Sequence, residues 1–234
     1  MYFVYDESIK NWVRDGARIL KFKTREIRTK IQYGLSAKRE INRYLQTHSC
    51  HKLHLGGKTR ELNGFLNTDV FGRIPINITR KLPFRDEEFE LIYSSHLIEH
   101  IFLEEFKYFL KESHRILKKG GKNVIATPSL EKISTTMYSD DEQAKTITRN
   151  RHQRTIKESV FTPCQHINNM IHLHFGHKYL YDFEFIKYLG KKAGYREVSK
   201  IANCSVPDET VVQYLRDAKP PSWDLETETF MLLK

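Results

Sequence analysis

The stretch from Lys52 to Pro128 decides the fold. It contains KLHLGG at 52–57, NGFLNTD at 63–69, INITRKLPFRDEEFELIYSSHLIEH at 76–100 and RILKKGGKNVIATP at 115–128. Short apolar runs bounded by turn residues predict strands, and one apolar stripe at helical spacing predicts a helix. The predicted strands are His51–Leu55, Gly64–Thr68, Phe89–Ser94 and Asn123–Ala126, and the helix is Leu103–Lys118, ended by Gly120-Gly121. This alternation predicts an α/β sheet with parallel strands.

Outside this stretch the pattern changes twice. Residues 1–50 look mostly helical and basic, whereas residues 129–175 are polar, rich in Thr, Asn, Gln and His, and weakly periodic. A segment of that length inside an α/β domain is more often a functional insertion than a plain loop. A helix over Asp182–Ala193, ended by Gly194, and strands at Glu197–Ala202 and Thr227–Leu233 complete the prediction.

Polar and small residues follow the predicted strands, where an open α/β sheet binds its ligands. Gly56 and Gly57 end the first strand and allow a sharp turn with close ligand approach. Asp69 ends the second strand, and its carboxylate can accept hydrogen bonds from two ribose hydroxyls. A strand that ends in two glycines is structural in most proteins, and an Asp here is equally well a turn or N-cap residue.

The segment LPF-x-D-x-x-F-x-x-I-x-x-S-H-x-x-E-H, followed by a helix and RILKKGG, is more specific. It resembles the class I S-adenosylmethionine-dependent methyltransferases, in particular the group often encoded beside glycan and lipopolysaccharide assembly enzymes. The resemblance is strong over about residues 50–130 and weaker at GHKYLYDFEFIKYLGKKAGY, 176–195. It implies a Rossmann-like, doubly wound sheet of seven mostly parallel strands with an antiparallel last strand and helices on both faces. The first 35 residues and the insertion are not covered by it. Resemblance and composition together divide the chain into a basic helical segment, 1–50, and a methyltransferase domain, 51–234, with an inserted lid or acceptor region at about 129–175.

The resemblance also implies a set of cofactor contacts. S-adenosyl-L-methionine would lie with its methionine part along Leu55, Gly56 and Gly57, its ribose on Asp69, and its adenine between Asn77 and Ile78. The sulfonium would lie beside Ser94, Ser95 and His96. Two positions depart from the family pattern: Lys58 stands where a second glycine is usual, and Asn77 where an Asp is usual. Asn can still both accept and donate a hydrogen bond at the adenine.

Methyl transfer to a hydroxyl needs a general base, and His is the best base near neutral pH. His96 ranks first because it follows the strand beside the predicted sulfonium. His177 and Asp182 are the other predicted catalytic residues, although Asp182 also suits an N-cap. His100 and Glu99 are further candidates.

Several histidines near the weakly patterned segment suit either a metal site or an acceptor-binding wall. They are His166, His172, His174 and His177. Zinc accepts imidazole ligands, but no carboxylate is interleaved before Asp182, and hard cations prefer oxygen ligands. We therefore expect no metal.

Composition limits the remaining choices. The chain has 234 residues, a formal net charge of +10 and three widely spaced cysteines, which suit neither a disulfide framework nor a CxxC metal site. With no signal-like N-terminus and no long apolar run, the expected location is the cytoplasm. The basic segment Arg14–Arg43 suits a phosphorylated substrate, an anionic membrane or nucleic acid, or is only a solvated helix face.

The leading prediction is an enzyme of polysaccharide biosynthesis that methylates a hydroxyl of a saccharide or sugar nucleotide, with a small molecule or a glycan as acceptor. Two alternatives remain open. One is an RNA methyltransferase that uses the basic N-terminal arm. The other is a catalytically inactive, methyltransferase-like binding protein.

Overall fold

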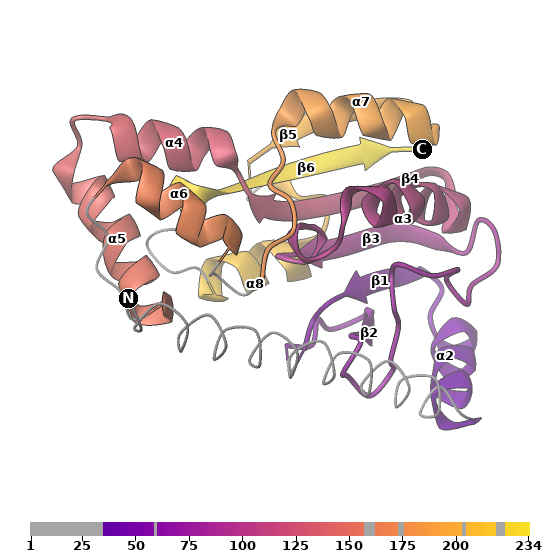
Figure 1. Ribbon diagram of the computed structural model, residues 1–234. Helices are drawn as coiled ribbons and strands as arrows, with labels where there is room; N and C mark the ends of the chain where they lie inside the picture. The colour runs from indigo at the N-terminus through magenta and orange to yellow at the C-terminus, as the bar shows by residue number, and fades with distance from the viewer. Residues whose placement is uncertain (1–34, 59, 157–161, 173–175, 203–204, 219–222) are drawn as a thin grey trace, which may run out of the picture.

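The computed structural model (Figure 1) describes residues 35–58, 60–156, 162–172, 176–202, 205–218 and 223–234. Most of the basic N-terminal segment, 1–34, therefore lies outside the described residues. Within the described part of the chain, no helix is long and apolar enough to cross a membrane.

A single sheet of six strands organises these residues in the order β2-β1-β3-β4-β6-β5. The strands are β1 Lys52–Leu55, β2 Leu66–Thr68, β3 Phe89–Ser95, β4 Leu117–Pro128, β5 Glu197–Ile201 and β6 Thr227–Leu233. The pairs β1–β2, β1–β3 and β3–β4 are parallel, whereas β6 runs antiparallel to both β4 and β5. The predicted mixed, mostly parallel sheet with an antiparallel last strand is confirmed.

The predicted count of seven strands is one too many for the described residues. After β2, the chain runs through turns and a loop to β3 instead of forming a further edge strand. Backbone hydrogen bonds from Gly72 to Asp69 and from Arg80 to Asn77 close two of these turns. Pro75 and Pro83, which cannot donate to a sheet ladder, lie in the same loop.

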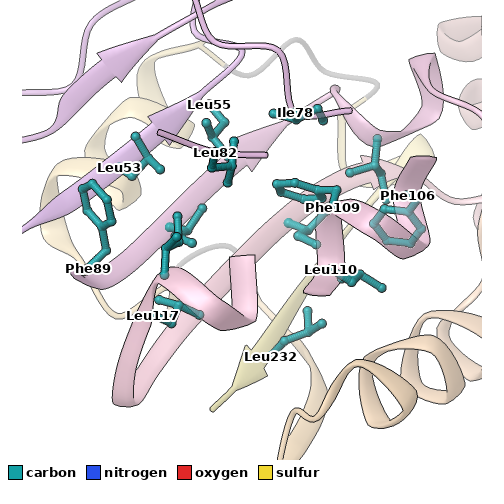
Figure 2. Packing of buried hydrophobic residues seen from close by; sticks show 14 of the residues in the cluster. Leu53, Leu55, Ile78, Leu82, Phe89, Phe106, Phe109, Leu110, Leu117 and Leu232 are labelled. Atoms are coloured by element: carbon teal, nitrogen blue, oxygen red, sulfur yellow. The ribbon is translucent and has the colours of Figure 1, made fainter. Parts of the chain in front are cut away.

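Helices cover both faces of the sheet, as predicted. They are α2 Leu35–Thr47, α3 Leu103–Ile116, α4 Leu130–Tyr138, α5 Glu142–Ile156, α6 Pro163–His172, α7 Phe183–Ala193, α8 Glu209–Ala218 and α9 Trp223–Glu226, with a 3-10 turn, η1, at Ile98–His100. Residues of α2, α3 and α7 share one apolar cluster with Leu53 and Leu55, part of which Figure 2 shows. Residues of α8 pack on the opposite face against Tyr93 and Val124.

Two boundaries differ from the prediction. Helix α3 ends at Ile116, before Lys118, because Leu117 already pairs with Phe89 of β3. The Gly120-Gly121 pair therefore lies within the extent of β4, where Gly120 adopts a φ of +75°. Helix α7 is confirmed with both of its ends: Asp182 accepts a hydrogen bond from the Phe185 N–H at its start, and Gly194 is left-handed at its end.

The weakly patterned segment 129–175 forms α4, α5 and α6 where it is described. Ile133, Met137 and Met170 make a small apolar cluster of their own between α4 and α6. Figure 1 places these helices at the end of the sheet toward which β1 points, which is the ligand-binding edge of a parallel sheet.

Candidate functional site

The turn after β1 needs its glycines for backbone reasons. Gly56 has a φ of +78°, and the Thr68 carbonyl oxygen accepts the N–H groups of both Gly56 and Gly57, at 3.0 and 3.2 Å. A Cβ at Gly57 would lie 2.6 Å from the His54 ring and 2.8 Å from the Arg60 carbonyl oxygen. These contacts hold the turn tightly against the start of the loop after β2.

Asp69 fixes this turn with its carboxylate. The residue is 7% exposed. Its Oδ2 accepts the Lys58 N–H at 3.0 Å, and its Oδ1 accepts the Phe71 N–H at 2.8 Å. Because a carboxylate offers about four acceptor positions, both oxygens can accept further bonds. Lys58 is itself left-handed, with a φ of +49°, which explains why glycine suits this position.

Side chains of α3 hold the loop that contains Asn77 and the LPF sequence, 82–84. The Arg115 guanidinium donates to the carbonyl oxygens of Leu82 and Phe84, and Glu112 Oε2 accepts the Leu82 N–H at 2.8 Å. Asn77 Oδ1 accepts from both the N–H and the hydroxyl of Thr79, so this oxygen is committed to the turn.

Two of the predicted cofactor residues are largely core residues. Leu55 and Ile78 belong to the apolar cluster beneath α3, and both are labelled in Figure 2. Their side chains fix the strand and the loop from below, so any cofactor contact at these positions involves mainly the backbone or the edge of the side chain.

The end of β3 carries a second polar group of side chains. The Ser94 hydroxyl is fully buried and makes no hydrogen bond within the described residues, whereas Ser95 is half-buried. His96 follows with a φ of +49°, and its N–H donates to the Ala126 carbonyl oxygen at 2.9 Å. Left-handed backbone at a non-glycine residue costs energy and is concentrated at functional sites.

The His96 ring lies between two partners. Its Nδ1 is 3.1 Å from Glu99 Oε1, and its Nε2 is 3.3 Å from the Thr227 hydroxyl oxygen. A carboxylate at Nδ1 favours the tautomer in which that nitrogen carries the proton and Nε2 is the acceptor. In this tautomer Nε2 is the nitrogen that can accept a proton from a substrate.

Glu99 is the buried centre of this group. Its side chain is fully buried, and its Oε2 accepts a hydrogen bond from the Thr127 hydroxyl at 3.1 Å. Burial alone would raise the pKa of Glu99, but the His96 contact and the imidazoles of His96, His100 and His177 lower it overall. The carboxyl group is therefore ionised at neutral pH.

His177 joins the same group from a distant part of the chain. The Lys178 N–H donates to the Glu99 carbonyl oxygen at 2.7 Å, and the rings of His177 and His100 meet edge to face, with centroids 4.9 Å apart. Burial lowers the pKa of His177 to about 4, against the opposing influence of Glu99. His96 and His177, predicted separately, thus lie around one carboxylate.

The remaining predicted catalytic and histidine-series residues do not belong to the group around Glu99. Asp182 caps α7 through its bond to Phe185, the structural role weighed for it. Of the histidine-rich series, His166 is buried on α6, whereas the side chain of His172 and all of His174 lie outside the described residues. A different set, Glu99, His100 and His177, brings three ligand-type atoms within 4.8 Å of one another.

Sequence reasoning missed the central position of Glu99 and the contact of Thr227 with His96. The H-x-x-E-H spacing at 96–100 could have indicated the first, because it places the carboxylate one turn after His96. Thr227 starts the closing strand, far along the chain, and no local pattern connects it to His96.

Residues 68–125 match the family model of the methyltransferase domain. The matched segment begins next to Asp69 and contains the LPF loop, Ser94 to His100 and helix α3. S-adenosyl-L-methionine is the cofactor that this match implies. The turn after β1 and helices α4 to α7 lie outside it.

The chain is also similar, at lower levels, to one curated protein and to several solved structures. An uncharacterized protein of Methanocaldococcus jannaschii is 30% identical over 79 residues, which are 34% of this chain and 38% of that protein. Among solved structures, a SAM-dependent methyltransferase of Archaeoglobus fulgidus has a TM-score of 0.46 at 15% identity, covering 90% of this chain and 94% of that one. A similar enzyme of Mesorhizobium loti gives 0.46 at 12% identity, covering 80% and 92%.

Proposed function

We propose that this protein is an S-adenosylmethionine-dependent methyltransferase that acts on a hydroxyl group. The observation that carries the proposal is the methyltransferase-domain match over 68–125. Within it, Asp69 follows β2 and the segment Ser94–His96 ends β3, two strands that pair with β1 in the parallel part of the sheet. That edge is where open α/β sheets bind nucleotide-type ligands.

The polar groups of the site fit the cofactor. Asp69 keeps acceptor capacity for ribose hydroxyls after fixing the turn, and the buried Ser94 hydroxyl would gain a partner from a polar ligand. Since Asn77 Oδ1 is used by Thr79, we expect the Asn77 amide nitrogen to face the adenine and donate to a ring nitrogen. Lys58 does not block the turn, because its side chain is exposed.

His96 is the proposed general base. Bound S-adenosylmethionine would supply an electrophilic methyl group on a positively charged sulfur. His96 Nε2 would take the proton of the acceptor hydroxyl as that oxygen is methylated. Glu99 then stabilises the imidazolium from the Nδ1 side. The long contact from Thr227 to Nε2 is one that an acceptor hydroxyl can replace.

The acceptor class is the finer part of the proposal. A saccharide or sugar-nucleotide hydroxyl is supported by the sequence resemblance to the glycan-associated group, and the helices α4 to α6 beside the site are the proposed acceptor region. Of the aromatic residues near this side, Tyr181 is buried and packs on Tyr179, with ring centroids 4.9 Å apart, so Tyr179 is the better candidate for sugar stacking.

Calorimetry with S-adenosylmethionine and S-adenosylhomocysteine tests the shared premise. We expect one site per chain with micromolar affinity, and no binding at millimolar ligand would refute the enzyme proposal in favour of an inactive binding protein. Transfer of a labelled methyl group to a panel of sugar nucleotides and glycans, with structured RNA as the competing substrate, then tests the acceptor. RNA labelling with a steep salt dependence would favour the RNA alternative.

A further inference from the structure

We propose that Glu99, His100 and His177 form a binding site for a divalent transition-metal ion, zinc being the metal that suits them best. These three side chains come from the turn after β3 and from the segment before α7, and their ligand-type atoms lie within 4.8 Å of one another. Two imidazoles and one carboxylate are a common zinc ligand set.

The distances are close to those that a metal ion needs. His100 Nε2 lies 3.9 Å from Glu99 Oε1. Ligand atoms at zinc bond lengths of about 2.0–2.2 Å are separated by roughly 3.3–3.5 Å in a tetrahedron. Side-chain adjustments of under about 1 Å would therefore bring the three atoms to bonding distance. His100 is only half-buried, so its ring can make such an adjustment at the surface.

The electrostatics of Glu99 favour a cation here. Its Oε1 is fully buried, and the imidazole nitrogens nearest to it are His96 Nδ1 at 3.1 Å and His100 Nε2 at 3.9 Å. A buried ionised oxygen without full compensation is costly. A divalent ion on one lone pair of Oε1, with His96 on the other, would satisfy this oxygen.

The surroundings of the three ligands resemble the outer shell of a metal site. Thr127 holds Glu99 Oε2, and the Lys178 N–H holds the Glu99 carbonyl oxygen, which fixes the His177 segment against the carboxylate. Such outer hydrogen bonds orient ligands and typically change metal affinity 10–100-fold.

The donor atoms select the kind of metal. Mg²⁺ and Ca²⁺ prefer six or more oxygen ligands, whereas imidazole nitrogen suits zinc and its first-row neighbours. Three protein ligands leave a fourth position for water or an acceptor oxygen, as in catalytic rather than structural zinc sites. The site adjoins His96, so a bound ion would lie beside the proposed base.

The test is a zinc titration of the whole chain after removal of metal with a chelator. We expect one zinc per chain by calorimetry and elemental analysis, and Co²⁺ in its place should give the visible absorption of a tetrahedral complex. His100→Ala should weaken zinc binding about 100-fold, and His177→Ala similarly, each judged on protein with an unchanged far-UV spectrum. The matched control is His48→Ala, an exposed histidine directly after α2, which should bind zinc as the parent does.

Substoichiometric zinc in the parent protein, or unchanged affinity in both ligand variants, would overturn the proposal. The titration is done without S-adenosylmethionine, so it does not depend on the proposed methyl transfer. Failure of cofactor binding with retained zinc would leave the metal site standing, and the reverse result would remove only the metal.

Discussion

Two strand ends of this sheet use the same unfavourable backbone conformation for different purposes. Lys58, after β1, and His96, after β3, both have a φ of +49° without being glycine. At Lys58 the backbone is what matters: its N–H donates to Asp69, and the side chain is exposed. At His96 the side chain matters, because Glu99 and Thr227 hold its two ring nitrogens.

Three acidic side chains of the candidate site repeat the difference. Asp69 and Glu112 accept backbone N–H groups and so fix the shape of the loops on the proposed cofactor side. Glu99 contacts a hydroxyl and an imidazole, and so orients groups that can take part in chemistry. After β1 the conformation of the backbone is what matters for the site, whereas after β3 the placement of the side chains is.

The largest expected effect is on the methyl-transfer rate, and it should differ between alanine variants of the two left-handed residues. His96→Ala should lower the methyl-transfer rate about 100-fold or more, since a positioned base contributes roughly that much, while cofactor affinity changes less than about threefold. Lys58→Ala should leave the rate within about twofold, because no side-chain function is lost. Single-turnover kinetics and calorimetry measure both, and equal rate losses would contradict the comparison.

A second expected effect concerns Asp69. Asp69→Asn keeps only one oxygen, so either the Lys58 or the Phe71 N–H loses its acceptor, and we expect about 1–2 kcal/mol less stability. Cofactor affinity should also fall about tenfold as the charge is lost. Urea unfolding and calorimetry measure these changes.

The matched control for Asp69 is Asp86→Asn. This exposed carboxylate pairs with Arg115 at the surface, so its loss should cost less than about 0.5 kcal/mol. Similar losses in the two variants would mean that Asp69 does not fix the turn as proposed.

Local sequence was enough for much of this architecture. The strand positions, the Asp182 and Gly194 ends of α7, and the location of Asp69 and His96 at strand ends all follow from periodicity and turn residues. The early end of α3 does not, because pairing of Leu117 with Phe89 overrides the helical pattern. Nor does the absence of a seventh strand from the described residues, where turns and two prolines follow β2.

The candidate site was predictable only in part, for a related reason. A strand end can be located from neighbouring residues, so His96 was found. The meeting of Glu99 with His177 depends on how the segment before α7 returns to the sheet, through the Lys178 N–H and the Glu99 carbonyl oxygen. Long-range contacts of this kind have no local signal, and they decide which histidines share a carboxylate.

A smaller effect is expected from pH at Glu112. Hydrogen bonding from Arg115 and the Leu82 N–H lowers the pKa of Glu112 in the folded protein. The ionised form therefore adds stability above the unfolded pKa of about 4.3, and this is lost as pH falls through the lower folded value. Compared with Glu112→Gln, the parent should lose about 1 kcal/mol more between pH 6 and pH 3 in urea titrations. Parallel pH profiles would show that Glu112 does not hold the loop.

The smallest expected effect comes from placing glycine at each of the two left-handed positions, Lys58 and His96. Lys58→Gly relieves a left-handed backbone without removing a contact, so it should raise stability by about 0.5–1 kcal/mol and leave cofactor affinity equal or better. His96→Gly relieves the same strain but removes the ring from between Glu99 and Thr227, so it should gain less stability or lose some. Opposite changes in thermal stability would establish that the left-handed backbone of Lys58 serves no purpose of its side chain. The left-handed backbone of His96 would then be what positions its reactive ring. Equal gains in stability in the two glycine variants would refute this difference between Lys58 and His96.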